Sequence, residues 1–142
     1  MLDVDRLSEC RVDLLAFTQE MFRARKGADF ILNWHHVEIC NALEKVMIGE
    51  TKRLIINIPP RYSKTEIAVV NFIAFCMGNF PDCEFIHASY SKRLATNNTW
   101  NARTVMMQEL YSEIFGAPTF MSDSNAKDEY RTTQGGCVYA TG

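Results

Sequence analysis

The sequence lacks three features: an excess of basic charge, a paired cysteine motif and a hydrophobic run that could cross a membrane. Its formal net charge is −2 with acidic and basic residues interspersed, so it has no strongly basic footprint for duplex DNA. None of its five cysteines forms a C-x-x-C pair, which favours reduced, structural thiols in a cytosol over metal or redox chemistry. The apolar run at residues 67–77 is shorter than the roughly 20 residues that span a bilayer. The N-terminus also lacks the pattern of a secretion signal.

The composition does provide a folded core. The chain has 142 residues, enough for one domain, and 47% of them are hydrophobic. Apolar residues recur at helical spacing between residues 4 and 24, and the basic turn before Gly27 is typical of a helix C-terminus. A second apolar stripe covers residues 37–47 and stops before Gly49. These patterns predict two amphipathic helices ahead of the central part of the chain.

The central stretch begins with an apolar run at residues 54–58, breaks at two prolines and ends in Lys64 and Thr65. The pattern predicts a buried strand that leads into a phosphate-binding loop. The following residues, 67–77, are apolar on nearly every side and predict a helix buried in an α/β layer. The N-terminus of such a helix, with free N–H groups and a positive dipole end, is a place where an anion can bind.

After this helix the pattern predicts a turn and another strand. Gly78 is expected to cap the helix, and residues 84–88 have the composition of a short strand. Strand, helix and strand form a βαβ unit, so we expect the two strands to be parallel with a right-handed crossover. The predicted fold class is therefore α/β, with a mostly parallel sheet flanked by helices.

The C-terminal third predicts one more helix and a hairpin. Ser91 offers a hydroxyl N-cap for a helix over residues 92–110. The polar segment 122–127 is expected to be a surface loop. Residues 129–133 and 137–140 have strand character on either side of a Gln-Gly-Gly turn, which predicts a β-hairpin.

The loop matches the general phosphate-binding pattern only in part. Lys64 and Thr65 occupy the positions of the lysine that neutralises phosphate charge and the hydroxyl that binds Mg²⁺. The two glycines of that pattern are replaced by Ile58 and Ser63. An alternative interpretation is a turn stiffened by proline, with Thr65 as a helix cap. Local spacing alone leaves both interpretations open.

Several blocks of the sequence, in order, resemble the large terminase subunit of tailed phages, the motor that packages viral DNA. The closest likeness is to that family's variant Walker A motif, in which a Pro-Pro-Arg loop runs into Gly-Lys-Ser/Thr-Glu. The blocks that carry the resemblance are residues 56–66, the Trp-His-His at 34–36, residues 49–56, residues 88–91 with Leu94, Ala95 and Arg103, and residues 135–142. The likeness spans residues 30–142, and Ser63 departs from it where the family usually has glycine.

The resemblance implies an ATP site with Mg²⁺. Lys64 would hold the β- and γ-phosphates, Thr65 would ligate Mg²⁺, and Arg61 would place a second positive charge near the γ-phosphate. Asn33 and Trp34 lie where related motors bind adenine, although Trp34 could equally be a core residue. Lys64 and Arg61 are thus the expected catalytic residues. The expected nucleotide-binding residues are Asn33, Trp34, Pro60, Arg61, Tyr62, Ser63, Lys64 and Thr65.

The resemblance also implies a cellular setting. The intact family protein acts in the cytoplasm of a bacterial host, away from membranes. Its partners are viral double-stranded DNA, the portal protein and the small terminase subunit, and it can assemble as a homo-oligomeric ring. In this chain we expect an N-terminal amphipathic helix at residues 1–29 and a P-loop ATPase domain at residues 30–142.

ATP hydrolysis in this fold also needs an acidic pair at the end of a later apolar strand. Asp123, Asp128 and Glu129 follow polar residues instead, and the three histidines lack ligand-like partners, so none is assigned to metal. The domain is expected to stop before the acidic strand and before a nuclease domain. We therefore expect weak ATP binding without turnover. The alternatives are a kinase-like or helicase-like P-loop protein, and a non-catalytic remnant or module that binds an anion or a partner.

Overall fold

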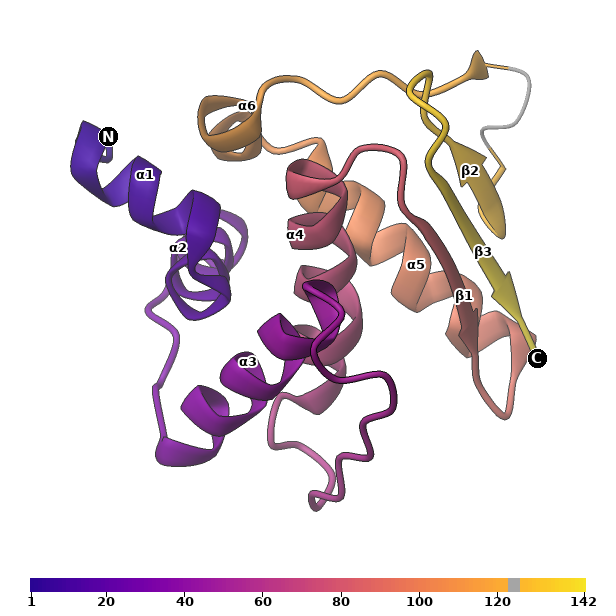
Figure 1. Ribbon diagram of the computed structural model, residues 1–142, viewed down its shortest axis with the longest axis horizontal. Helices are drawn as coiled ribbons and strands as arrows, with labels where there is room; N and C mark the ends of the chain where they lie inside the picture. The colour runs from indigo at the N-terminus through magenta and orange to yellow at the C-terminus, as the bar shows by residue number, and fades with distance from the viewer. Residues whose placement is uncertain (123–125) are drawn as a thin grey trace.

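The computed structural model describes residues 1–122 and 126–142, and the chain is an α/β protein. In these residues six α-helices and one π-helix flank a small mixed sheet of three strands. Figure 1 shows the N-terminal helices on one side of the molecule and the sheet on the other, with the remaining helices between them. Residues 123–125, which include Asp123 and part of the predicted loop, lie outside the described residues.

The single helix predicted at residues 4–24 is two helices, α1 (Val4–Val12) and α2 (Leu14–Lys26). Asp13 lies between them in an extended conformation, and its carboxylate accepts hydrogen bonds from two N–H groups in the first turn of α2. A short acidic side chain at this position stabilises the start of a new helix in preference to a continuous one. Helix α2 ends as predicted at Gly27, which has a φ of 69°.

The central helices are α3 (Trp34–Met47), a π-helix η1 (Glu66–Asn71) and α4 (Phe72–Asn79). Helix α3 ends before Gly49, as the sequence indicates. The predicted cap at Gly78 is wrong, because this glycine lies inside α4. A Cβ at Gly78 would lie 2.5 Å from the ring of Phe115, so glycine is needed here for close packing.

Two helices replace the one predicted at residues 92–110. Helix α5 (Lys92–Met106) begins after Ser91, whose hydroxyl accepts a hydrogen bond from the third N–H group of the helix, as predicted. Gln108 then adopts an extended conformation, and α6 (Glu109–Phe115) leaves in a new direction. This turn allows Tyr111 to be buried and to donate a hydrogen bond to a carbonyl of α4 at 2.8 Å.

The sheet has the order β1-β3-β2. Strand β1 (Glu84–Ala88) pairs in parallel with β3 (Cys137–Thr141), and β2 (Glu129–Arg131) pairs antiparallel with β3. The predicted hairpin and the predicted strand at residues 84–88 are confirmed. With one parallel and one antiparallel pair, the sheet is mixed and not mostly parallel.

The strand predicted at residues 54–58 is wrong as a member of the sheet. In the part of the chain that the structure describes, residues 52–60 form no strand or bridge pairing, and β1 pairs with β3 alone. The parallel pair is therefore joined through α5 and α6, not through the helix that follows the loop at residues 59–63. Apolar, β-branched composition predicts an extended backbone, but it does not show whether a neighbouring strand lies at ladder distance.

One hydrophobic core joins the N-terminal helices to the rest of the molecule. The ring of Phe17 on α2 lies 5.5 Å from that of Phe75 on α4 and 6.1 Å from that of Tyr111 on α6, measured between centroids. All three rings are buried. Among the described residues, no helix combines the length and hydrophobicity needed to cross a membrane.

Candidate functional site

The loop between residue 59 and the start of η1 has an unusual backbone. Pro59 and Pro60 restrict the chain to extended and turn conformations. Arg61 and Ser63 then both have φ of 68°, and in the described chain they are the only residues other than glycine with positive φ. The backbone becomes helical at Lys64. A left-handed conformation costs a residue with a Cβ roughly 1–2 kcal/mol, so this short loop carries two local strains.

Positive φ next to helical residues turns successive N–H groups toward one side of the chain. Such a concave run of N–H groups binds anions, and the following helix dipole adds positive potential. Ser63 occupies the position where the phosphate-binding pattern has glycine, and its φ of 68° explains why glycine is preferred there. Residue 63 therefore has the positive φ that this pattern needs, although it is a serine and not the glycine that adopts positive φ most easily.

The side chains of Lys64 and Thr65 are exposed at the first helical turn. Thr65 is itself helical, with φ of −65° and ψ of −39°, and its side chain makes no capping hydrogen bond. The alternative interpretation of Thr65 as a helix cap is therefore wrong. The turn is closed by a backbone hydrogen bond of 3.0 Å from Ile67 N to Ser63 O. Both side chains remain available to a ligand at the loop.

The helix beyond the loop is a π-helix held by buried polar groups. The Nδ2 of Asn71 donates to the carbonyl of Glu66 at 2.8 Å, and Asn71 is 1% exposed. The carboxylate of Glu66 also forms an ion pair with Arg25 of α2. Single π turns are frequent at functional sites. The sequence analysis did not predict these contacts, because it treated Glu66 only as the last residue of the motif.

Two of the expected nucleotide-binding residues, Asn33 and Trp34, lie beside the loop. With Tyr62 they line a hollow of about 440 Å³ between the start of α3 and residues 56–59. Trp34 is 74% exposed, so the interpretation of this residue as core is wrong. Asn33 is the N-cap residue of α3, and its Oδ1 accepts a hydrogen bond of 2.8 Å from the N–H of Trp34.

The two histidines after Trp34 connect this hollow to the loop. His36 is buried, and its Nδ1 accepts a hydrogen bond of 2.9 Å from the N–H of Asn33. The Nε2 of His35 lies 3.3 Å from the carbonyl oxygen of Tyr62. Burial, with a smaller contribution from neighbouring His35, lowers the pKa of His36. Asn33 and His36 form a capping box at the start of α3. Their spacing of three residues is visible in the sequence, but the sequence analysis did not predict this cap.

A larger hollow of about 560 Å³ is lined by Lys64 and Thr65. Its polar lining includes His87, whose Nε2 lies 3.2 Å from the Nδ2 of Asn98 and whose pKa is lowered by burial. No aspartate or glutamate is among the residues that line it in the described chain. The remaining lining is largely apolar.

The structure thus brings Asn33, Trp34 and Tyr62 around one hollow and Lys64 and Thr65 around another, and Ile56 lines both hollows. The other expected residues, Pro60, Arg61 and Ser63, line neither of these two hollows. Within the described ranges, no three His, Cys, Asp or Glu side chains lie close enough together to hold a metal ion. Thr65 and the phosphates of a nucleotide would be the available Mg²⁺ ligands. Comparison of the chain with protein-family models, curated proteins and solved structures finds no match.

Proposed function

We propose that this chain is an ATP-binding module that holds the phosphates of ATP on the loop at residues 60–65, as the corresponding part of a terminase large subunit does. One observation carries the proposal: Arg61 and Ser63 are left-handed directly before a helix that begins at Lys64. Backbone strain of this kind persists where the surroundings require it and clusters at ligand sites. A phosphate received by the loop N–H groups would offset it.

The side chains fit the same ligand. Lys64 would neutralise charge on the β- and γ-phosphates, and exposed Arg61 would add a second positive charge. The exposed ring of Trp34 and the ring of Tyr62 border a hollow of about 440 Å³, which offers an adenine ring a stacking surface beside the phosphates. Asn33 would supply a polar contact to the base.

Thr65 would ligate Mg²⁺, which supplies charge neutralisation to the phosphates when bound. In the described chain no carboxylate lines the hollow beside Lys64 and Thr65. We therefore propose weak binding without turnover by this chain. In the larger assembly that the resemblance implies, ATP hydrolysis would drive viral double-stranded DNA into a capsid in the host cytoplasm, with a portal protein and a small terminase subunit as partners.

Calorimetric titration of the chain with ATP and Mg²⁺ tests the proposal. Lys64→Ala should weaken binding about tenfold or more, because it removes a charge-assisted phosphate contact. Lys52→Ala, at an exposed lysine outside the loop, is the matched control and should bind as the wild type does. Equally poor binding by wild type and Lys64→Ala would favour the non-catalytic remnant. Steady-state hydrolysis that depends on Lys64 would contradict the absence of turnover.

A further inference from the structure

Arg25 connects the N-terminal helices to the helix that follows the loop at residues 59–63. It lies in the last turn of α2, before residue 30, where the resemblance begins. Its guanidinium forms an ion pair with the carboxylate of Glu66, and both side chains are partly buried. Salt screens a partly buried pair less than an exposed one. The contact therefore joins α2 firmly to the helix that begins at Lys64.

Glu66 is also held from within its own helix. The Nδ2 of Asn71 donates a hydrogen bond of 2.8 Å to the carbonyl oxygen of Glu66. The same Nδ2 lies 3.4 Å from the carboxylate oxygen that pairs with Arg25. Asn71 is buried, and Glu66 and Asn71 are the first and last residues of the π-helix η1. Two different elements, α2 and η1, thus fix the position of Glu66.

The side chains of Lys64 and Glu66 leave this helix in different directions. Residues two positions apart do not face each other on a helix. Lys64 is exposed and lines the hollow of about 560 Å³, whereas the carboxylate of Glu66 contacts α2. A rotation of the helix about its axis would move both side chains together. The pair with Arg25 therefore sets the direction in which Lys64 points.

Helix α2 is a fixed support for this contact, because it is anchored in the core. Phe17 of α2 is fully buried against the aromatic rings of α4 and α6. At the end of α2, the N–H of Gly27 donates a hydrogen bond of 2.9 Å to the carbonyl of Arg23. Arg25 therefore extends from an ordered helix turn and can restrict the helix that begins at Lys64.

We propose that Arg25 is a positioning residue of the nucleotide site and that, through Glu66, it directs Lys64 toward the phosphates of ATP. This inference rests on the proposed function, to which it adds a contribution from the N-terminal helices. Coupling between two contacts is reciprocal. If the Arg25 pair strengthens ATP binding, bound ATP strengthens the pair by the same factor. The end of α2 should then be better ordered in the ATP complex than in the free chain.

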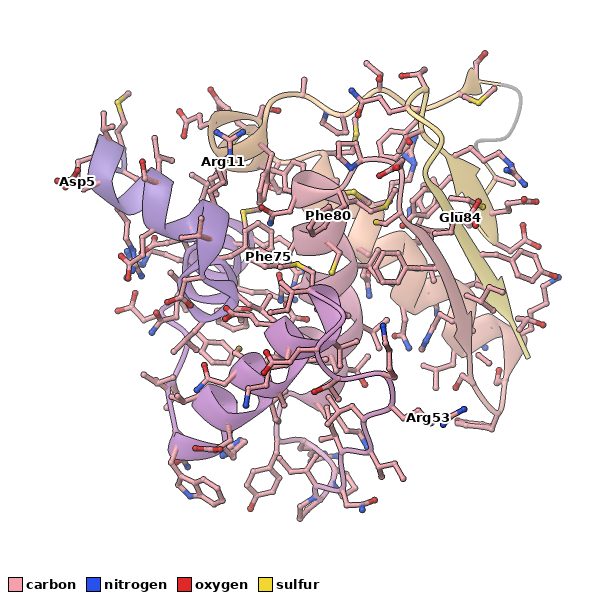
Figure 2. The ribbon with its side chains drawn as sticks, in the orientation of Figure 1. Asp5, Arg11, Arg53, Phe75, Phe80 and Glu84 are labelled. Carbon is pink, nitrogen blue, oxygen red and sulfur yellow. The ribbon has the colours of Figure 1, made fainter. Side chains whose placement is uncertain are left out.

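Calorimetric titration of the 142-residue chain with ATP and Mg²⁺ measures this coupling. Arg25→Gln should weaken ATP binding about fivefold, at the lower end of the usual range for coupled sites. Arg25→Lys keeps the positive charge and should restore part of the affinity. Arg11→Gln is the control and should bind as the wild type does: Arg11 is exposed on α1, and Figure 2 shows it at the opposite end of the molecule from the loop. Circular dichroism confirms that each variant is folded.

Hydrogen–deuterium exchange at saturating ATP separates positioning from a purely structural role. In the free chain, the N–H groups of Ile67 and Gly27 are both hydrogen-bonded. In the wild type, ATP should slow exchange at Ile67, beside the loop, and also at Gly27, at the end of α2. In Arg25→Gln, ATP should slow exchange at Ile67 alone, because the connection to α2 is lost.

Three outcomes would contradict these expectations, and they can be told apart. Equal ATP affinity of the wild type and Arg25→Gln would overturn this inference and leave the proposed function standing. Equal slowing of exchange at Gly27 in the two proteins would also overturn it, because α2 would then respond to ATP without the pair. Absence of ATP binding by the wild type would overturn the proposed function, and this inference with it.

Discussion

The carboxylate of Glu66 and the guanidinium of Arg25 form an ion pair that joins α2 to the helix that follows the loop at residues 59–63. The two side chains are 24% and 13% exposed, so the pair is largely shielded from water. Glu66 also accepts a hydrogen bond of 3.4 Å from the Nδ2 of Asn71. Through this contact the N-terminal helices fix the direction of the helix that begins at Lys64.

Replacing Arg25 with glutamine should lower the free energy of unfolding by about 2 kcal/mol, because Glu66 loses a charged partner in a partly buried site. Urea denaturation measures the change. Arg131→Gln is the control for the same chemical change in an exposed pair: Arg131 on β2 is 48% exposed and pairs with Glu129, which is 39% exposed. Its loss should cost less than about 1 kcal/mol. Equal costs for the two variants would contradict the structural role of the Arg25 pair.

Ser63→Gly should raise the free energy of unfolding by about 0.5–1 kcal/mol. The substitution removes a left-handed strain of roughly 1–2 kcal/mol and adds chain entropy to the unfolded state, which offsets part of the gain. Ser8→Gly makes the same chemical change at an exposed position inside α1 and should destabilise the protein by about 0.5 kcal/mol. A loss of stability at both sites would show that residue 63 is not left-handed.

Stability should fall as the pH drops below about 6.5, the pKa of histidine in an unfolded chain. Burial and neighbouring His35 lower the pKa of His36 in the folded state. As the pH falls, the unfolded chain therefore binds a proton at this histidine before the folded chain does, and this favours unfolding. This contribution to stability is present above about pH 6.5 and is lost as the pH falls through the lower folded-state pKa. Urea midpoints at several pH values test it. His36→Asn should reduce the slope, and parallel profiles for the two proteins would refute the assignment.

Tyr130 anchors the sheet to α5. Its buried hydroxyl donates a hydrogen bond of 2.7 Å to the carbonyl of Thr99. Tyr130→Phe should lower the free energy of unfolding by about 1–2 kcal/mol, because it removes this buried hydrogen bond. Tyr139→Phe, at a side chain that is 39% exposed, should change stability by less than about 0.5 kcal/mol. Thermal or urea denaturation of the two variants measures the difference.

The sequence predicted the elements whose signals are local. The cap at Gly27, the N-cap at Ser91 and the hairpin before residue 137 all follow from residue type and position, and all three are confirmed. The same local signals missed two helix breaks, at Asp13 and Gln108, because the apolar stripe continues across both of them. Hydrophobic periodicity shows which face is buried and does not show that a helix changes direction.

The sequence predicted which residues belong to the candidate site, but it did not predict how those residues are arranged. The motif pointed to Lys64 and Thr65 and to Ser63 as the residue that replaces a glycine. The structure adds that Ser63 has a positive φ, the conformation for which glycine is preferred. The Arg25–Glu66 pair joins residues 41 positions apart, which no local pattern reports. The strand predicted at residues 54–58 was wrong for a similar reason, since strand pairing depends on a distant partner.

The most direct test of the central claim is an amide NMR titration of the chain with ATP and Mg²⁺. The largest shift changes should fall on residues 61–65, whose N–H groups would receive the phosphates, with smaller changes at Trp34. In Lys64→Ala these changes should need about tenfold more ATP. Shift changes scattered over the surface, or the same titration curve in Lys64→Ala as in the wild type, would contradict it.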